Sequence, residues 1–350
     1  MVSVDPSLRL ADFDYHLPEE LIAQSPPVDR DGGRLLLVDR KSRQLTDLAV
    51  RDLPELLRAH DLVVVNNTRV LPARLRGRRE TGGAIELLLL RRIQPGVWEA
   101  LAKPARKLLP PRRITLISRS GDMSIVADVR ENFGDGRIVL AFDPGLERCL
   151  DDYGAIPLPP YIRSHIDDTE RYQTIFGNVP GSAAAPTAGL HLSESLLAGL
   201  QERGVMRADV TLHIGLDTFR PVTAERIAYH VIHREWCEIP ALTAQAIQRA
   251  KSGGRVVAVG TTSARTLESW GVLPEEERAS GWSGWTDIFI TPGFEWTTVD
   301  AMLTNFHLPK STLLMMISSF AGRELAMASY MHAVEQRYRF FSFGDAMLIV

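Results

Sequence analysis

The sequence predicts an α/β main domain, a layered sheet with helices, that is interrupted by an inserted small antiparallel β-barrel domain. Helical and strand-like segments alternate towards both ends of the chain, whereas short β-rich segments with hardly any helical periodicity begin near Leu71. A chain of 350 residues that is 45% apolar also favours two domains. We therefore expect a discontinuous α/β catalytic domain at residues 1–70 plus 156–350 and an inserted domain at residues 71–155.

The α/β domain is predicted from buried-strand and amphipathic-helix patterns. Strands are expected at 34–39 (RLLLVD) and 61–66 (DLVVVN) before the insertion. After it, the pattern predicts further strands and helices. They lie at 193–204, 207–215, 241–254, 255–260, 263–270, 311–322, 324–338 and 345–350. Residues 274–286 (PEEERASGWSGWT) are rich in Gly, Pro and acidic residues and are predicted to form a mobile surface loop.

The inserted domain is predicted from five β-rich segments that follow one another at short intervals. They are AIELLLLRR at 84–92, WEALAK at 98–103, RITLIS at 113–118, SIVADVR at 124–130 and RIVLAF at 137–142. Turns rich in Gly, Pro and charged residues separate them, which is typical of a small barrel or sandwich.

The charge of the chain is unevenly distributed. The net charge is −3, yet residues 69–119 contain 13 Arg and Lys against 3 Glu, a local excess of +10. Such a segment indicates a polyanionic partner, although a solvated basic surface explains the same composition. Two distant cysteines and the absence of an apolar signal segment or a membrane-length apolar run predict a cytoplasmic protein that does not contact a membrane.

Three expected strand-to-helix or turn-to-helix junctions carry small hydroxyl groups, and two also carry a histidine. They are VGTTSARTLES (Thr261, Thr262, Ser263, Arg265), PTAGLHLSES (Thr187, Gly189, His191) and LTNFHLPKST (Thr304, Asn305, His307). Because junctions at the carboxyl ends of strands line the ligand crevice of an α/β sheet, a polar site is expected there. Helix capping alone explains the hydroxyls, but it does not explain Asn305 with His307.

Two histidine-containing segments lead to different expectations. His213 ends an expected strand before a glycine turn, where an imidazole is a candidate general base, although a structural role suits a lone histidine as well. YHVIHREWCEI contains His230, His233 and Glu235, but it reads as a strand and lacks the helical spacing of a zinc motif. No metal site is therefore predicted.

Taken together, these segments resemble the S-adenosylmethionine:tRNA ribosyltransferase-isomerase family of queuosine biosynthesis. The resemblance runs nearly end to end. It includes DFDYHLPEELIAQSP, DLVVVNNTRVLPARL, PTAGLH, VTLHIGLDTFRPV, VGTTSARTLES, TPGFEWTTVDAMLTNFHLPKSTLLMMISSFAG and YRFFSFGDAMLI. The chain departs from the family pattern at Asp217, Leu192, Gly32 and Gly33, and Asp217 adds a carboxylate close in sequence to His213.

The resemblance implies that the ribosyl part of S-adenosylmethionine, a co-substrate, is transferred to 7-aminomethyl-7-deazaguanine at the wobble position of GUN-anticodon tRNA. These are the tRNAs for Asp, Asn, His and Tyr. Adenine and methionine leave, epoxyqueuosine forms, and no prosthetic group is required. Removal of a C5′ proton needs a base, for which His191, His213 and His307 are candidates. The substrate-binding candidates are Thr187, Gly189, Thr261, Thr262, Ser263, Arg265, Thr304 and Asn305.

The resemblance also gives the basic segment a role. Enzymes that act on one base of an RNA take it out of the stack, so we expect the inserted domain to hold the anticodon arm through Arg74, Arg76, Arg78 and Arg79. A monomer is expected. Two alternatives stay open, namely a relative that binds tRNA without this catalysis or with another acceptor, and an ordinary methyltransferase, which the absence of a Gly-rich DxGxGxG loop disfavours.

Overall fold

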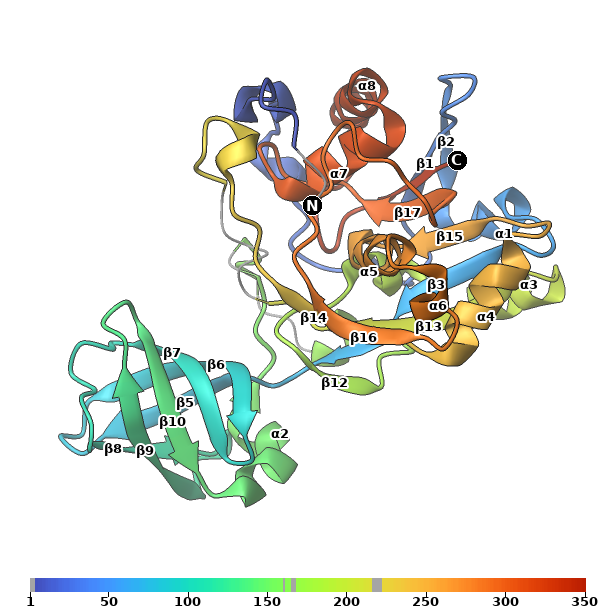
Figure 1. Cartoon of the computed structure of the whole chain (residues 1–350). Helices are drawn as coiled ribbons and strands as arrows, with labels where there is room; N and C mark the ends of the chain where they lie inside the picture. The colour runs from blue at the N-terminus through green and yellow to red at the C-terminus, as the bar shows by residue number, and fades with distance from the viewer. Residues whose placement is uncertain (1–3, 160, 165–167, 216–221) are drawn as a thin grey trace. The chain divides into compact units, whose positions relative to one another are not determined.

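The computed structural model of the chain describes residues 4–159, 161–164, 168–215 and 222–350 (Figure 1). These residues form two compact units. One comprises Met1–Arg69, Pro160–Val179 and Ala185–Val350, and the other comprises Val70–Pro159 and Pro180–Ala184. Each unit has its own apolar core.

The first unit is built on a mixed sheet of nine strands in the order β16-β14-β13-β3-β15-β17-β18-β1-β2. Its centre is parallel, because β3 pairs in parallel with β13 and β15, and β15 with β17. Strands β14 and β18 pair antiparallel with this centre, β1 pairs in parallel with β18, and the edge strands β16 and β2 pair antiparallel with β14 and β1. The strands are β1 (Arg34–Val38), β2 (Leu45–Ala49), β3 (Leu62–Asn66), β13 (Met206–Leu212), β14 (Glu235–Ile239), β15 (Val256–Val259), β16 (Trp282–Thr286), β17 (Ala301–Asn305) and β18 (Ala346–Ile349).

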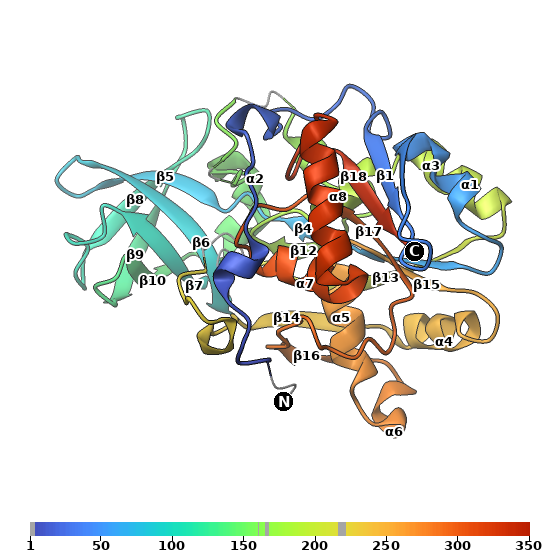
Figure 2. The same ribbon diagram turned by 90° about the horizontal axis from the view of Figure 1, so that it is seen from above.

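Helices cover both faces of this sheet. Alternate residues of the fully buried β3 face opposite cores, with Leu62 and Val64 in one and Val63 and Val65 in the other. The first core also contains residues of α4 (Ala241–Ala250), α5 (Thr261–Gly271), α7 (Thr312–Ala321) and α8 (Arg323–Glu335). The second contains residues of α1 (Leu53–Leu56) and α3 (Glu194–Glu202). Helices α7 and α8 pack on each other after a turn at Gly322 (Figure 2).

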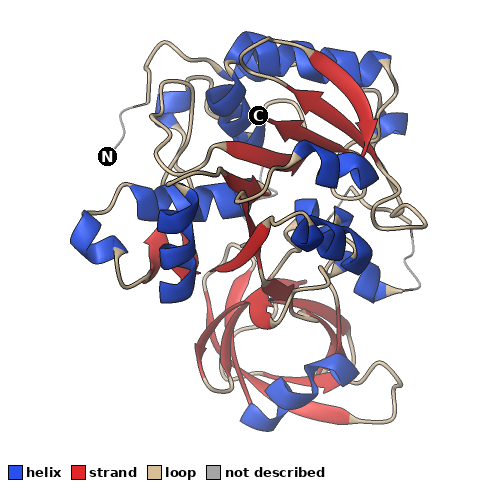
Figure 3. Cartoon of the chain, turned by 90° about the vertical axis from the view of Figure 1, so that its right-hand side faces the viewer, coloured by secondary structure: helices blue, strands red, loops and turns tan. Residues whose placement is uncertain are grey.

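The second unit is a closed antiparallel barrel of six strands in the order β5-β6-β7-β10-β9-β8, closed by pairing of β5 with β8. Figure 3 shows these strands as a ring. They are β5 (Arg74–Arg79), β6 (Ala84–Gln94), β7 (Val97–Lys103), β8 (Arg113–Ile117), β9 (Ser124–Asn132) and β10 (Arg137–Phe142). Strand β11 (Gly154–Ala155) adds to β5 after α2 (Leu150–Tyr153), and β4 (Thr68–Val70) pairs with β12 (Val179–Ser182). The expected α/β fold with a small antiparallel barrel is therefore confirmed.

One local expectation was wrong. Residues 274–286 do not form a loop, since they contain α6 (Glu275–Arg278) and β16, an edge strand of the nine-stranded sheet. Trp282 and Trp285 pair across to Ile239 and Trp236 of β14. The segment looked like a loop because it is rich in Gly, Pro and acidic residues, but pairing with β14 outweighs the low strand propensity of Gly284 between the two tryptophans.

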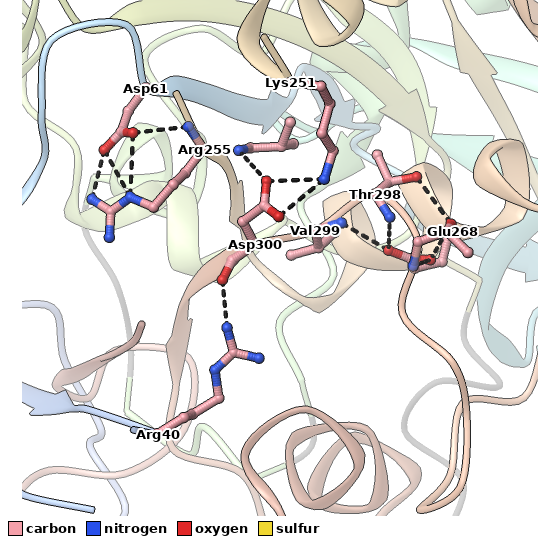
Figure 4. Close-up of polar contacts among 10 residues, drawn as sticks. Arg40, Asp61, Lys251, Arg255, Glu268, Thr298, Val299 and Asp300 are labelled. Carbon is pink, nitrogen blue, oxygen red and sulfur yellow. Dashed lines mark hydrogen bonds and ion pairs between the residues drawn. The ribbon is translucent and has the colours of Figure 1, made fainter. Parts of the chain in front are cut away.

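Paired charges lie at the amino ends of the central strands (Figure 4). Asp61, just before β3, accepts hydrogen bonds from Arg255, with an ion-pair distance of 2.6 Å. Asp300, just before β17, pairs with Lys251 at 3.0 Å and accepts the backbone N–H of Val256 at 2.8 Å. These carboxylates satisfy backbone donors at the strand starts and so help to fix the register of the sheet.

Glu268 of α5 is expected to contribute strongly to stability. Its fully buried carboxylate accepts hydrogen bonds from the backbone N–H groups of Thr297, Thr298 and Val299, each at 2.9 Å, and from the Thr297 hydroxyl at 2.9 Å. Glu268→Ala leaves these donors buried without an acceptor, so the free energy of unfolding should fall by about 3 kcal/mol or more. Denaturant unfolding measures this, with the exposed Glu276→Ala as control. Equal stability of the two variants would contradict the assigned role.

Candidate functional site

The candidate site is built at the carboxyl ends of the four parallel strands. Strand β13 leads to His213, β3 ends at Asn66, β15 leads through Gly260 to Thr261, and β17 ends at Asn305. Neighbouring strands lie about 4.8 Å apart, so three strand spacings place the β13 and β17 ends roughly 14 Å from each other. The predicted residues that follow β15 and β17 therefore lie, together with His213, along the carboxyl ends of neighbouring strands in one sheet.

The Asn66 amide joins three segments of the chain at this edge. Its Oδ1 accepts the backbone N–H groups of Leu212 and Thr68, both at 3.1 Å, and its Nδ2 donates to the Leu212 carbonyl at 3.0 Å and the Thr262 hydroxyl at 3.2 Å. Every hydrogen-bonding position of this 1% exposed amide is used. Asn66 thereby fixes the positions of the segments that carry His213 and Thr262.

His213 is the half-buried histidine of the three candidates. Its Nδ1 lies 2.8 Å from the Thr68 hydroxyl, and its ring stacks on Trp236 with centroids 5.4 Å apart and planes 19° apart. Burial lowers the pKa of His213 below its ordinary value, which favours the neutral ring. A neutral imidazole that is held through Nδ1 can use Nε2 to accept a proton.

The hydroxyl groups at the start of α5 do not cap that helix. Gly260, at φ +88°, occupies the N-cap position, and no side chain caps the helix. Ser263 instead donates to the Val259 carbonyl at 2.8 Å, while the Thr262 hydroxyl accepts from Asn66. The capping interpretation is thus wrong for α5, whereas Ser193 and Ser311 do cap α3 and α7.

The Thr187–His191 turn contacts the end of β17. Asn305 Nδ2 donates to His191 Nε2 at 3.1 Å, and the Thr187 hydroxyl donates to Asn305 Oδ1 at 3.4 Å. Gly189 is required for this packing, because a Cβ there would lie 2.8 Å from both Phe176 and Thr174 side-chain atoms. His191 is 3% exposed, and burial together with the nearby Arg339 lowers its pKa to about 4.

His307 points into the core beside α8. Its Nδ1 lies 3.0 Å from the Tyr330 hydroxyl, its Nε2 lies 3.4 Å from Thr304 Oγ1, and the Tyr15 hydroxyl donates to its carbonyl. Burial lowers the pKa of His307 to about 3. Both ring nitrogens therefore have protein partners, and the His307 residue as a whole is 6% exposed.

Arg265 is occupied by a protein carboxylate. It donates to Glu235 through one terminal nitrogen and to the His233 carbonyl at 2.9 Å through the other. Both members of the ion pair are buried, at 7% exposure for Arg265 and 4% for Glu235. The described residues contain no group of three or more His, Cys, Asp or Glu that could hold a metal ion.

Sequence reasoning missed several residues of this edge, notably Asn66, Thr68 and Trp236. The signal for Asn66 and Thr68 was their position directly after the most strongly predicted buried strand. Asp217 lies outside the described residues. Leu192 is fully buried in the core shared with α3, and a Cβ on Gly33 would lie 3.3 Å from Asp345 Oδ1 and 3.7 Å from His191 Nδ1.

A cavity of about 960 Å³ lies away from this edge, against the first residues of β3 and β13 and helix α3. It is lined by Leu62, Val63, Leu197, Met206 and Arg207, among others, and holds none of the predicted site residues. No helix among the described residues is long and apolar enough to span a membrane.

The mixed sheet with a polar edge at its strand carboxyl ends, together with the separate barrel, defines an α/β enzyme with an uncharged, hydrogen-bonding site. Residues 10–349 match the family model described as "Queuosine biosynthesis protein". A protein of Symbiobacterium thermophilum named S-adenosylmethionine:tRNA ribosyltransferase-isomerase is 50% identical over 98% of this chain and 100% of its own length. The chain belongs to this family of tRNA-modifying transferase-isomerases of queuosine biosynthesis.

A solved structure agrees with this assignment. The crystal structure of S-adenosylmethionine tRNA ribosyltransferase from Thermotoga maritima matches with a TM-score of 0.57 at 36% identity, covering 97% of this chain and 100% of the other. The resemblance inferred from the sequence motifs is thus confirmed. The methyltransferase alternative has no support from these relatives.

The two buried histidines predict a pH dependence of stability. His191 and His307 have pKa values of about 4 and about 3 in the folded protein, below the ordinary 6.5. The unfolded chain therefore binds more protons than the folded one between these values and 6.5, and stability is lost as the pH falls from 6.5 towards 4, by roughly 1.4 kcal/mol per pH unit for each histidine.

Denaturant unfolding at pH 7 and pH 4.5 measures this slope. His307→Asn should reduce the loss of unfolding free energy across the interval, whereas substitution of the exposed His16 by Asn should leave the slope unchanged. A variant slope equal to that of the wild type would show that His307 does not contribute to it.

Proposed function

We propose that this chain transfers the ribosyl moiety of S-adenosylmethionine to 7-aminomethyl-7-deazaguanine at the wobble position of GUN-anticodon tRNA, with release of adenine and methionine and formation of epoxyqueuosine. The family assignment supports the reaction class. The observation that carries the residue assignment is the convergence of His213, Thr262 and Asn305 on one sheet edge through parallel strands. Incubation with S-adenosylmethionine and precursor-bearing tRNA tests it, and adenine release must depend on the tRNA.

His213 is the proposed general base. Abstraction of a C5′ proton beside the sulfonium requires a neutral ring with an accessible nitrogen, and His213 is half-buried, whereas His191 and His307 are buried against protein partners. Thr68 would set its orientation through Nδ1. His191 and His307 would then act by holding Asn305 and Thr304 in place.

The remaining predicted polar residues would bind the ribose and methionine parts of S-adenosylmethionine. Thr261, Thr262 and Ser263 begin a helix without a side-chain cap, so its backbone N–H groups suit a carboxylate or ribose hydroxyls. Thr187, Gly189, Thr304 and Asn305 form the opposite side of the site. Since Arg265 is paired with Glu235, we assign it to holding β14 against α5 and not to a ligand carboxylate.

The barrel is the proposed contact for tRNA. Residues 71–155 hold 15 Arg and Lys against 11 Asp and Glu, so the acidic residues after 119 offset much of the local excess. Arg74, Arg76 and Arg78 are exposed on alternate positions of β5, and among described residues no ion pair involves Arg76, Arg78 or Arg79. Arg74 lies 3.5 Å from Glu86. We also propose that the enzyme acts as a monomer.

Loss of the proposed base should act on turnover more than on binding. His213→Gln is expected to lower the rate of tRNA-dependent adenine release by roughly 10² to 10⁴-fold, with the KM for S-adenosylmethionine changed only a few-fold. Thr68→Val keeps the shape but removes the Nδ1 partner, so an intermediate loss is expected. Near-normal turnover of His213→Gln would exclude His213 as the base.

Neutralising β5 should weaken tRNA binding through its electrostatic part. The triple variant Arg76→Gln, Arg78→Gln and Arg79→Gln should reduce the slope of log affinity against log salt by about 2, since each phosphate contact with a single strand contributes about 0.7. The matched control changes Arg91, Arg113 and Arg130 to Gln, which are exposed but ion-paired. An identical slope for both triple variants would remove β5 from this role.

A further inference from the structure

A second cluster of ionisable groups lies next to His213, and the roles assigned above use only its Glu235–Arg265 ion pair. It consists of His233, Glu235 and Arg265, from the segment leading into β14 and from α5. The Glu235 and Arg265 side chains are 4% and 8% exposed, whereas the His233 side chain is 18% exposed. The imidazole is thus the most exposed member of the cluster.

Glu235 holds the cluster together. One carboxylate oxygen lies 3.2 Å from His233 Nε2 and accepts the Gly215 N–H at 3.2 Å, while the other accepts from Arg265. Arg265 also donates to the His233 carbonyl at 2.9 Å. The backbone of His233 and one nitrogen of its ring are therefore both fixed by the same ion pair, an arrangement that sets the ring orientation.

The cluster is directly connected to the proposed base. Gly215 lies two residues beyond His213, and Trp236, which follows Glu235, stacks on the His213 ring. The backbone N–H of His213 donates to the Trp236 carbonyl at 3.1 Å. The two histidines are consequently held by the same pair of strand ends, β13 and β14, on one side of the site.

The carboxylate remains ionised in this setting. Burial acts to raise the pKa of Glu235, but the hydrogen bond from His233 and the charge of Arg265 outweigh it, so the pKa is lowered. Among the described residues, other titratable groups that act on the cluster are His230 on the same segment and Cys237 on β14, whose pKa burial raises to about 12, and Arg234, which follows His233, pairs with Asp287 at 3.9 Å. The carboxylate holds the His233 ring in one orientation through its contact with Nε2.

We propose that His233 is the general acid of the reaction and that Glu235 is its positioning residue. As the bond between ribose and adenine breaks, its electron pair goes to the adenine ring and the His233 proton goes to the same ring. The proton that His213 takes from C5′ balances this transfer, and exchange with water resets both rings after turnover. The site thus separates base and acid between two histidines on neighbouring strand ends.

This inference rests on the proposed function, and the experiment separates the two. The full-length enzyme is incubated with S-adenosylmethionine and precursor-bearing tRNA in deuterated water. Adenine release is measured together with deuterium incorporation at C5′ of the recovered S-adenosylmethionine. His233→Gln should retain C5′ exchange while adenine release falls at least 100-fold, and His213→Gln should lose both.

The remaining variants test the cluster itself. His230→Gln is the matched control, since His230 packs against Phe289 with ring centroids 5.4 Å apart and lies outside the cluster, so neither readout should change. Glu235→Gln should reproduce the His233→Gln pattern in weaker form. Because that change leaves Arg265 buried without its counter-ion, Glu235→Asp is measured beside it and thermal unfolding is recorded for each variant.

The outcomes are distinct. Normal adenine release by His233→Gln, or equal loss of release and exchange, would overturn the acid role. Normal release by both Glu235 variants would overturn the positioning role. Absence of tRNA-dependent adenine release from the wild-type enzyme would instead refute the proposed function.

Discussion

The arrangement of the site depends on one constraint, the saturated hydrogen bonding of the Asn66 amide. Four bonds connect this side chain to the end of β13, to the chain leaving β3 and to the first turn of α5. A hydrophobic residue of similar size would leave the Leu212 backbone groups without these partners. Three segments that are far apart in sequence therefore keep one relative position, and the base candidate and the hydroxyl groups are presented together.

The two ends of the central strands differ in their chemistry. Ion pairs of Asp61 with Arg255 and of Asp300 with Lys251 lie at the amino ends. Amide and hydroxyl groups and the neutral His213 ring gather at the carboxyl ends, where Glu235 and Arg265 form a buried ion pair. A site of this kind can bind a sulfonium nucleoside without a large field of its own, and it can stabilise charge as it develops during the reaction.

Much of the fold could be predicted from sequence, because the spacing of apolar residues and the composition of each segment indicate strands and helices directly. The buried run before Asn66 and the short β segments after Leu71 each had one reasonable interpretation. The loop predicted at 274–286 failed because the pairing partner of an edge strand is not visible locally. The site residues were found in part, since strand-to-helix junctions are visible in sequence, but the burial of His307 depends on its packing beside Tyr330 of α8, which no local pattern indicates.

The closure of the barrel also determines how its arginines are spaced. Gly77 lies where β5 meets β8, and a Cβ there would come within 2.8 Å of the Thr115 carbonyl oxygen, so the two strands approach closely beside Arg76 and Arg78. Residues two apart on a strand are separated by roughly 6.8 Å, and a closed sheet cannot stretch this interval. The arginines on β5 therefore keep a fixed spacing. If a polyanion binds along them, the strand has little backbone entropy left to lose.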